Sequence, residues 1–365
     1  VFSSQNVLLE TFDDVEVKIE ERLRTDLLID PSGRVYDSQD GRLLDGAEVF
    51  VYHVDGLPAD RLLEPSIRQQ WRLVAPEDLE APSQQGQRTA HGGLYAFSVR
   101  RAGAYAIEVV PPGPSYVGPS ERVPAVPGFA VADAQNRVVE AELPSVESDA
   151  DRTWFVAFNL QGPDDEFFNN HIPLDPLTSL ITVDKRARQR TAKIGEAITY
   201  EIDIINHSRG ADLLFDPASK TGGVFLQDTL PKGLKYIGRS AVMVRVRNGR
   251  EEPLFAADPS GIRILKFTGP GQQPFDLHAG EALRLRYQAA VGTDTRPNRT
   301  YTNRVVLMAQ GNVPVSLPSK ADVRVIPDPD FDQGLLLGKV WCDADGDGRQ
   351  GPDEAGVPGA RVYLD

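Results

Sequence analysis

The sequence predicts an all-β protein made of β-sandwiches in tandem. Helical periodicity is nearly absent along the 365 residues, whereas 32 glycines and 28 prolines punctuate short runs of alternating apolar and polar residues. The clearest run is Ile198–Asn206, in which every second residue is apolar from Ile198 to Ile204. The run from Leu283 to Gln288 repeats this pattern. Period-two alternation of this kind is typical of a sheet with one core face and one solvated face.

Length and charge limit the partners that this chain can have. The 365 residues suffice for two or three domains, each with its own core. The net charge of −14, with no cluster of Lys and Arg that forms a basic stripe, argues against nucleic acid and anionic membranes as partners. No apolar run approaches the ~18 residues of a spanning helix, so we expect no direct membrane insertion. The single cysteine, Cys342, excludes an internal disulfide framework.

Residues 1–29 are expected to form an N-terminal strand or linker piece. Asn6–Thr11 and Val15–Glu20 fit extended segments, but the charge alternation of Val17–Arg24 fits one short helix equally well. The first ten residues lack the features of a signal peptide, and Ala360–Asp365 begins a strand and then stops. We therefore expect a fragment of a longer protein.

The first module is expected over residues 30–145, with a polar surface insertion rich in Gln and Pro at 57–87. Its predicted strands are Arg34–Tyr36, Ala47–Tyr52, Leu94–Val99 and Ala104–Val110. The series Gly33-x-Val-x-Asp37, Asp45-Gly-Ala-x-Val49, Gly93-x-Tyr-x-Phe97 and Gly103-x-Tyr105 resembles the transthyretin-like modules of bacterial surface proteins. These include the carboxypeptidase regulatory-like, Cna B-type and serine-aspartate-repeat B-type domains. The resemblance implies a transthyretin-like β-sandwich.

A connector is expected at 146–176, with a strand at Trp154–Leu160 and a turn-rich bridge at Asn169–Pro176. His171 beside Asn169 and Asp175 could form a ligand set. The two prolines of the bridge favour instead a hydrogen-bonded turn that locks two domains together.

The second module is expected over residues 177–326. The motifs that identify it are Gly195-Glu-x-Ile-x-Tyr-x-Ile-x-Ile-x-Asn206, Asp228-Thr-Leu-Pro-Lys-Gly-Leu234, Gly280-Glu-x-Leu-x-Leu285 and Thr302-Asn303. They resemble the surface-repeat family filed as a domain of unknown function, the DUF-eleven family. That resemblance implies an immunoglobulin-like sandwich in a large cell-surface or secreted bacterial protein.

Some relatives of this module join a lysine and an asparagine through an isopeptide bond between the first and last strands. Lys185 shares strand parity with Ile181 and Val183, and Asn303 shares it with Val305, so both side chains are predicted to face the core. A buried lysine is costly unless it is neutralised or bonded, which makes the placement informative. Asp228 is the candidate for the assisting carboxyl group. The alternative is a lysine at a strand end that extends to water.

Residues 327–334 read as a stiff linker, and 335–365 as the truncated start of a further module. Gly338-Lys-Val-Trp341 and Pro358-Gly-Ala-x-Val362 resemble a serine-aspartate-repeat B-type module. Leu335–Trp341 and Ala360–Leu364 are predicted strands.

Between these strands, residues 343–354 match the calcium-loop pattern D-x-[DN]-x-[DN]-G-x5-E. We expect Ca²⁺ as the cofactor, because carboxylate and carbonyl oxygens from a flexible loop suit this hard cation. The predicted ligands are the side chains of Asp343, Asp345, Asp347 and Glu354 and the carbonyl of Arg349. The alternative is an acidic surface turn that binds no ion.

No catalytic motif is present, and the five histidines are scattered singly. We therefore expect a non-enzymatic structural or adhesive stalk segment of a bacterial cell-surface or secreted protein, located outside the cell and rigidified by calcium. Its partners would be calcium and a surface protein or glycan of the host or a neighbouring cell. Two alternatives stay open: a glycan- or protein-binding module that uses residues 57–87, and the accessory region of an exported enzyme.

Overall fold

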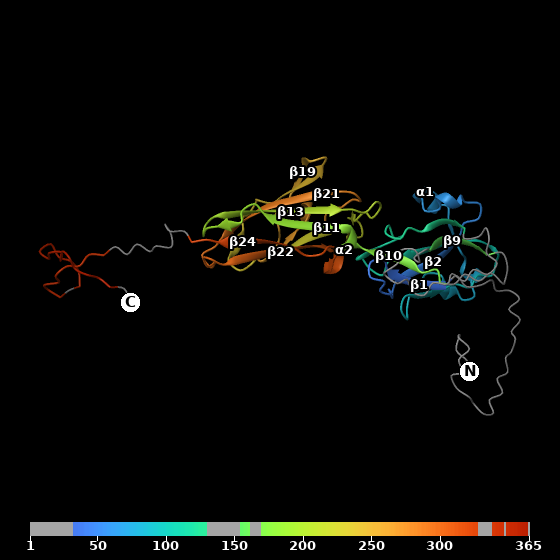
Figure 1. The fold of residues 1–365 in the computed structure, drawn as a ribbon, viewed down its shortest axis with the longest axis horizontal. Coiled ribbons are helices and arrows are strands. Elements are labelled where there is room, and N and C mark those ends of the chain that lie inside the picture. Colours follow the sequence, from blue (N-terminus) through green and yellow to red (C-terminus); the bar gives the residue numbers. More distant parts are fainter. Residues whose placement is uncertain (1–31, 130–153, 161–168, 328–337, 347, 364–365) are drawn as a thin grey trace, which may run out of the picture.

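The computed structural model describes residues 32–129, 154–160, 169–327, 338–346 and 348–363. Two β-sandwiches follow one another along the chain, as Figure 1 shows, with the first on the right and the second on the left. Within the described residues, the α-helices are two single turns, α1 (Pro65–Arg68) and α2 (Leu177–Leu180). The all-β prediction is confirmed.

Two sheets form the first sandwich. One has the strand order β5 (Leu94–Ala96), β1 (Ser32–Asp37), β10 (Ile172–Pro176) and β7 (Tyr116–Val117). The other has the order β3 (Arg72–Leu73), β2 (Glu48–His53), β6 (Gly103–Val110), β9 (Phe155–Leu160) and β8 (Val126–Phe129), and β4 (Gln87–Arg88) pairs with β2. The four strands predicted in the first module each overlap an observed one.

Residues 57–87 cover the first sandwich with short 3-10 turns (Ala59–Arg61, Pro76–Asp78 and Pro82–Gln84), α1, β3 and the start of β4. The prediction of a surface insertion is wrong for the apolar side chains of this segment, which are buried in the core: Leu62, Ile67, Trp71, Val74 and Leu79. The segment is rich in Gln and Pro, so its overall composition does not indicate that these apolar side chains are buried.

The bridge predicted at Asn169–Pro176 contains β10, a full member of the first sandwich. β10 runs parallel to β1, with Ile172 opposite Val35. The Nδ1 atom of His171 accepts a hydrogen bond from the backbone N–H of Arg34 at 3.1 Å. The predicted turn is therefore wrong, because residues 172–176 form a buried strand. The hydrogen bond to His171 likewise argues against a free ligand set. Close approach also explains a glycine, since a Cβ on Gly33 would lie 2.3 Å from the carbonyl oxygen of Asn170.

Hydrogen bonds order the end of the first sandwich and connect it to the second. The buried carboxylate of Asp175 accepts from the hydroxyl groups of Ser38 and Ser120, each at 2.5 Å. Glu121 accepts from the backbone N–H of Arg209, in the second sandwich, at 2.8 Å. β10 then continues directly into α2 and the first strand of the second sandwich, so the connection contains no loose linker.

The second sandwich also has two sheets, here named the lysine sheet and the asparagine sheet after Lys185 and Asn303. The lysine sheet has the order β11 (Ile181–Ala187), β13 (Ala197–Asn206), β21 (Ala282–Val291), β18 (Val242–Arg247) and β19 (Arg250–Ala256), and β17 (Leu234–Tyr236) pairs with β21. The asparagine sheet has the order β12 (Thr191–Ala192), β24 (Ser319–Val325), β22 (Thr300–Ala309), β16 (Val224–Thr229) and β20 (Ile264–Phe267), and β23 (Val313–Pro314) pairs with β22. A separate two-stranded ribbon joins β14 (Phe215–Asp216) and β15 (Thr221–Gly222), and two 3-10 turns, Pro270–Gln272 and Gln310–Asn312, complete the module.

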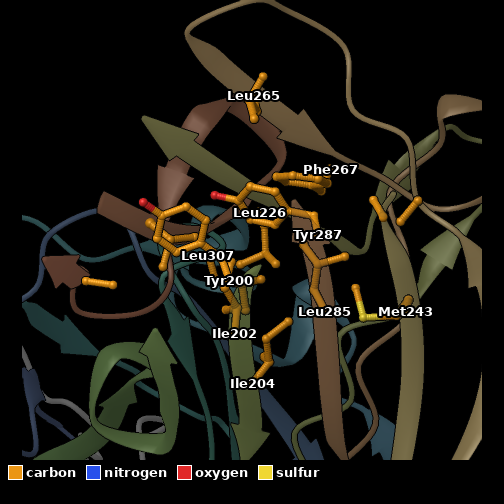
Figure 2. Close-up of a cluster of buried hydrophobic side chains, with 14 of the residues drawn as sticks. Tyr200, Ile202, Ile204, Leu226, Met243, Leu265, Phe267, Leu285, Tyr287 and Leu307 are labelled. Carbon is orange, nitrogen blue, oxygen red and sulfur yellow. The ribbon is translucent and has the colours of Figure 1, made fainter. Parts of the chain in front are cut away.

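The core of this sandwich follows from the alternation in the sequence. Tyr200, Ile202 and Ile204 of β13 lie opposite Tyr287, Leu285 and Leu283 of β21. Figure 2 shows Tyr200, Ile202, Ile204, Leu285 and Tyr287 from β13 and β21 together with Leu226, Phe267 and Leu307 of the facing sheet. Apolar packing between the two sheets therefore surrounds whatever polar group points inward.

Strands were predicted on both sides of the C-terminal acidic loop. In the described part of this segment, residues 338–346 and 348–363, the only β pairing is a single bridge between Trp341 and Gly356. The strand prediction at residues 360–363 is therefore wrong, because these residues have no strand to pair with in the described chain. Leu335–Leu337 of the other predicted strand and Leu364 lie outside the described residues.

Candidate crosslinking site

The structure brings together the three residues predicted for a crosslink. Lys185 lies on β11 of the lysine sheet, whereas Asp228 on β16 and Asn303 on β22 belong to the asparagine sheet. Asp228 is opposite Val305, which is two residues beyond Asn303, so both polar side chains share the inner face of their sheet. Asn303 lies on the central strand of its sheet, between β24 and β16, and not on the last strand. The expectation that the bond joins the first and last strands is corrected in this respect.

The side chains of the three residues predicted for the crosslink are fully buried. The side chains of Lys185 and Asp228 are 0% exposed, and Asn303 is also 0% exposed. The Nζ atom of Lys185 contacts Oδ2 of Asp228 directly. The backbone N–H of Lys185 donates to the hydroxyl oxygen of Ser319 at 2.9 Å, which ties β11 to β24. A lysine held inside in this way cannot extend to water, so the alternative of an exposed head group does not apply.

The Tyr287 hydroxyl group lies at the centre of the cluster. It accepts from Nζ of Lys185 at 3.0 Å and from Nδ2 of Asn303 at 2.6 Å, and it donates to Oδ2 of Asp228 at 2.9 Å. One hydroxyl group thus contacts all three predicted residues. The alternating run from Leu283 to Gln288 predicts that Tyr287 faces the core with Leu283 and Leu285, but it indicates no role for the hydroxyl group. The available signal was a tyrosine, which needs a polar partner when buried, on the same inner face as the buried lysine.

Two oxygens of the cluster have no hydrogen-bond partner among the described residues: Oδ1 of Asp228 and Oδ1 of Asn303. Both atoms are fully shielded from solvent. An unpaired buried acceptor costs about 1–3 kcal/mol, and such exceptions require a functional or structural explanation.

Electrostatics favour the uncharged forms of the lysine and the carboxyl group. Burial lowers the pKa of Lys185, and the attraction of Asp228 opposes this change. Burial likewise raises the pKa of Asp228, opposed by Lys185 and by hydrogen bonds from Tyr287 and Asn303. A proton shared between the two groups leaves a neutral amine, which is a nucleophile, beside a protonated acid.

Aromatic rings enclose the amine. Nζ of Lys185 lies 4.6 Å from the ring centroid of Tyr200 and 5.0 Å from that of Tyr287. The two rings stack on each other at 5.3 Å, and Phe267 lies 5.0 Å from Tyr287. Figure 2 shows these three rings within the core. They exclude water and hold the lysine chain in one orientation.

On the outer face of the lysine sheet, a carboxylate pairs with several arginines. Glu201 accepts hydrogen bonds from Arg286 and Arg188, each at 2.7 Å, and from Arg186 at 3.1 Å. Burial alone would raise the pKa of Glu201, but these three hydrogen bonds outweigh it and lower the pKa to about 2. Hydrogen bonds to Glu251 and Glu201 raise the pKa of Arg286. This face is a network of fixed charges at the solvent boundary.

The C-terminal acidic loop also has a defined geometry. Ligand atoms of Asp343, Asp345 and Glu354 lie within 4.8 Å of one another. The two carboxylate oxygens of Glu354 accept from the backbone N–H groups of Gly351 and Ala344, each at 2.8 Å, and these bonds lower the pKa of Glu354. An acidic cluster of this composition could hold a metal ion. Of the other predicted ligands, Arg349 lies on the same loop, and Asp347 is outside the described residues.

Comparisons with known proteins leave the chain without an assigned family. No family model matches it, and no curated protein matches it. Solved structures with a similar fold include BcpA, the major pilin subunit of Bacillus cereus (11% identity, covering 82% of this chain and 69% of that chain, TM-score 0.31). Others are the major pilin SpaD from Corynebacterium diphtheriae (12%, 82% and 64%, 0.34) and the RrgB pilus protein from Streptococcus pneumoniae (14%, 74% and 42%, 0.37).

The chain therefore spans less than two thirds of the length of SpaD and of RrgB. Identities and TM-scores this low assign neither a family nor an activity to this chain, so the functional argument depends on its own residues. Among the described residues, no helix is long and apolar enough to cross a membrane.

Proposed function

We propose that this chain is a non-enzymatic structural segment whose second sandwich is locked by an isopeptide bond between Lys185 and Asn303. The observation that carries the proposal is the fully buried Lys185–Asp228–Asn303 cluster across the two sheets. A buried ion pair alone is a weak source of stability, because the cost of desolvating both charges offsets their attraction. A covalent bond removes that cost, since the lysine becomes part of a neutral amide.

The reaction is an amide exchange that needs no cofactor. Nζ of neutral Lys185 attacks Cγ of Asn303, the Cγ–Nδ2 bond breaks, and ammonia leaves with one proton taken from Nζ. Protonated Asp228 assists by donating a proton toward Oδ1 of Asn303, where negative charge develops. This role uses the two buried oxygens that otherwise lack a partner. Each molecule reacts once, so the product is a modified scaffold and not a turned-over substrate.

Such a bond would make the second sandwich resist pulling. It would join β11 at the start of the module to β22 near its end, so tension applied at the two termini would bypass residues 186–302. Tandem sandwiches with a closely hydrogen-bonded junction are suited to a stalk or spacer. The location that fits this role is outside the cell, in a bacterial surface or secreted protein, as the motif resemblance implies. Partners there would be surface proteins or glycans.

Single-molecule stretching of the full chain tests the mechanical role. The wild-type second sandwich should show no extension from residues 186–302 at any force that leaves covalent bonds intact. Lys185→Met, which keeps the chain length but cannot react, should release these residues in a single unfolding event. Full extension of the wild-type module would contradict the proposed function.

We further propose that the acidic loop at residues 343–354 binds calcium and stiffens the C-terminal segment. The oxygen donors favour a hard cation, and affinity should lie in the ~0.1–1 mM range of extracellular modules. Calorimetry should detect calcium binding to the wild-type chain but not to Asp345→Ala. The matched control is Asp258→Ala, an acidic change outside the loop that should leave the heat unchanged. Equal heat from wild type and Asp345→Ala would show that the loop is only an acidic turn.

A further inference from the structure

We propose that Tyr287 is a catalytic residue of the crosslinking reaction, and that its hydroxyl group relays the proton from the attacking lysine nitrogen to the leaving amide nitrogen. The inference rests on the proposed crosslink between Lys185 and Asn303 and assigns a step of it to a residue outside the predicted set. Its basis is geometric: one hydroxyl oxygen lies 3.0 Å from Nζ of Lys185 and 2.6 Å from Nδ2 of Asn303.

Proton balance requires that one proton moves from Nζ to Nδ2. Formation of the Nζ–Cγ bond leaves Nζ with one proton too many, and Nδ2 needs one more proton before it can depart as ammonia. The Tyr287 oxygen already accepts a hydrogen bond from each nitrogen. Once Cγ is tetrahedral, Nδ2 is an amine with a free lone pair, so the hydroxyl hydrogen can turn from Oδ2 of Asp228 to Nδ2 and transfer there while the oxygen takes the proton of Nζ. The hydroxyl group is regenerated, and no oxidant, reductant or further reactant is needed.

This arrangement leaves Asp228 available to donate a proton toward Oδ1 of Asn303. Its Oδ2 atom accepts the hydroxyl hydrogen of Tyr287 at 2.9 Å, which leaves the lone pairs of the Tyr287 oxygen facing the two nitrogens. Its Oδ1 atom has no partner among the described residues and is available to the Asn303 carbonyl. Two proton transfers at one carbon are thus divided between two side chains. Burial also raises the pKa of Tyr287 well above its usual value, so the group carries its proton at neutral pH.

A buried tyrosine of the first sandwich provides a matched control. Tyr95 on β5 is also buried, and its hydroxyl group donates to the backbone carbonyl oxygen of Asn170 at 2.6 Å. Tyr95→Phe therefore removes a hydrogen-bonded buried hydroxyl group without changing the lysine, aspartate and asparagine of the second sandwich.

The test follows crosslink formation in the full chain after cell-free synthesis, with loss of one ammonia measured by intact-mass spectrometry at intervals. Tyr287→Phe should slow the loss of ammonia by about 100-fold or more, the usual effect of removing a general acid–base group. Tyr95→Phe should react at nearly the wild-type rate. Circular dichroism of each variant checks that it has folded.

A second variant keeps the test decisive if Tyr287→Phe does not fold. A fluorinated tyrosine placed at position 287 keeps the hydroxyl group and its packing but makes the phenol more acidic, so a relay role predicts a rate change of several-fold. Unchanged rates for both Tyr287→Phe and the fluorinated chain would overturn the role of Tyr287 and leave the crosslink intact. A wild-type chain that never loses ammonia would overturn the crosslink itself, and the relay with it.

Discussion

Both faces of the lysine sheet place basic residues beside carboxylates, but the effect on the charge of these groups differs between the faces. Lys185 and Arg186 are neighbours on β11, and Arg286 and Tyr287 are neighbours on β21. Lys185 and Tyr287 point inward to Asp228, whereas Arg186 and Arg286 point outward to Glu201. Inside, burial shifts the pKa values of Lys185 and Asp228 toward their neutral forms. Outside, hydrogen bonds lower the pKa of Glu201 to about 2 and keep it charged.

This difference shows that the solvent, and not the identity of the charged pair, decides what a lysine or arginine does beside a carboxylate. At the solvated face, water screens the charges and the pairs remain ionic. In the core, the desolvation cost favours proton transfer, which leaves reactive neutral groups. Neighbouring residues of one strand therefore differ: Arg186 forms a surface ion pair, whereas the role we propose for Lys185 is that of a nucleophile.

The two faces should differ most in how much stability is lost when both members of an ion pair are replaced. In the core, the double variant Lys185→Met/Asp228→Leu removes both charges at similar volume, which for a simple buried pair is neutral or stabilising. If a crosslink closes the long loop from residue 185 to 303, its loss should instead destabilise the second sandwich by about 4 kcal/mol, by analogy with a disulfide. Chemical denaturation measures the change. On the outer face, Arg284 donates to the carboxylate of Asp203 at 3.0 Å. The control Arg284→Met/Asp203→Leu should change stability by about 1 kcal/mol or less.

The buried carboxylate of the first sandwich sharpens the comparison, because Asp175 accepts from hydroxyl donors and has no cation against it in the described part of the chain. Asp175→Ala should destabilise the first sandwich by about 2–3 kcal/mol, since it leaves the Ser38 and Ser120 hydroxyl groups without their acceptor. Thermal unfolding should show this loss in the first sandwich. Asp184→Ala, at an exposed position on β11, should stay within about 0.5 kcal/mol of wild type. Similar stabilities for both variants would show that Asp175 is not needed at the junction.

Acid should weaken the outer face over a defined range of pH. The pKa of Glu201 is about 2 in the folded chain and 4.5 in its unperturbed state, so its stabilising effect is complete above 4.5 and lost as the pH falls toward 2. Glu201→Gln should therefore cost about 1 kcal/mol at neutral pH and flatten the loss of stability between pH 4.5 and 2. Denaturation curves across this range measure the slope. The exposed Glu252→Gln is the control, and an unchanged slope in Glu201→Gln would contradict the role of this network.

The sequence predicted the inner face well where strand alternation was regular. Parity alone placed Lys185 and Asn303 on core faces, and the two strands Ala197–Asn206 and Ala282–Val291 agree with the predicted runs. Pairing between strands was not available from that pattern. The Tyr287 hydroxyl group meets its three partners only when β11, β16 and β22 converge from distant parts of the chain.

Prediction failed where contacts are non-local or composition misleads. Ser38 and Ser120 are far from Asp175 in sequence, so nothing near Asp175 indicated a buried acceptor. The Gln- and Pro-rich composition of residues 57–87 suggested a surface loop, although Leu62 and Trp71 pack into the core. The outer charge network shows the same limit: alternation predicted polar residues on that face but not the pairing of Glu201 with three arginines.

The mass of the purified wild-type chain tests the central claim most directly. If Lys185 and Asn303 have reacted, the intact mass falls below the sequence mass by one ammonia, and proteolysis yields one branched peptide that contains both residues. Lys185→Met should have its full sequence mass and yield two separate peptides. An unmodified wild-type mass, with Lys185 and Asn303 recovered in separate unlinked peptides, would contradict the crosslink and the structural role built on it.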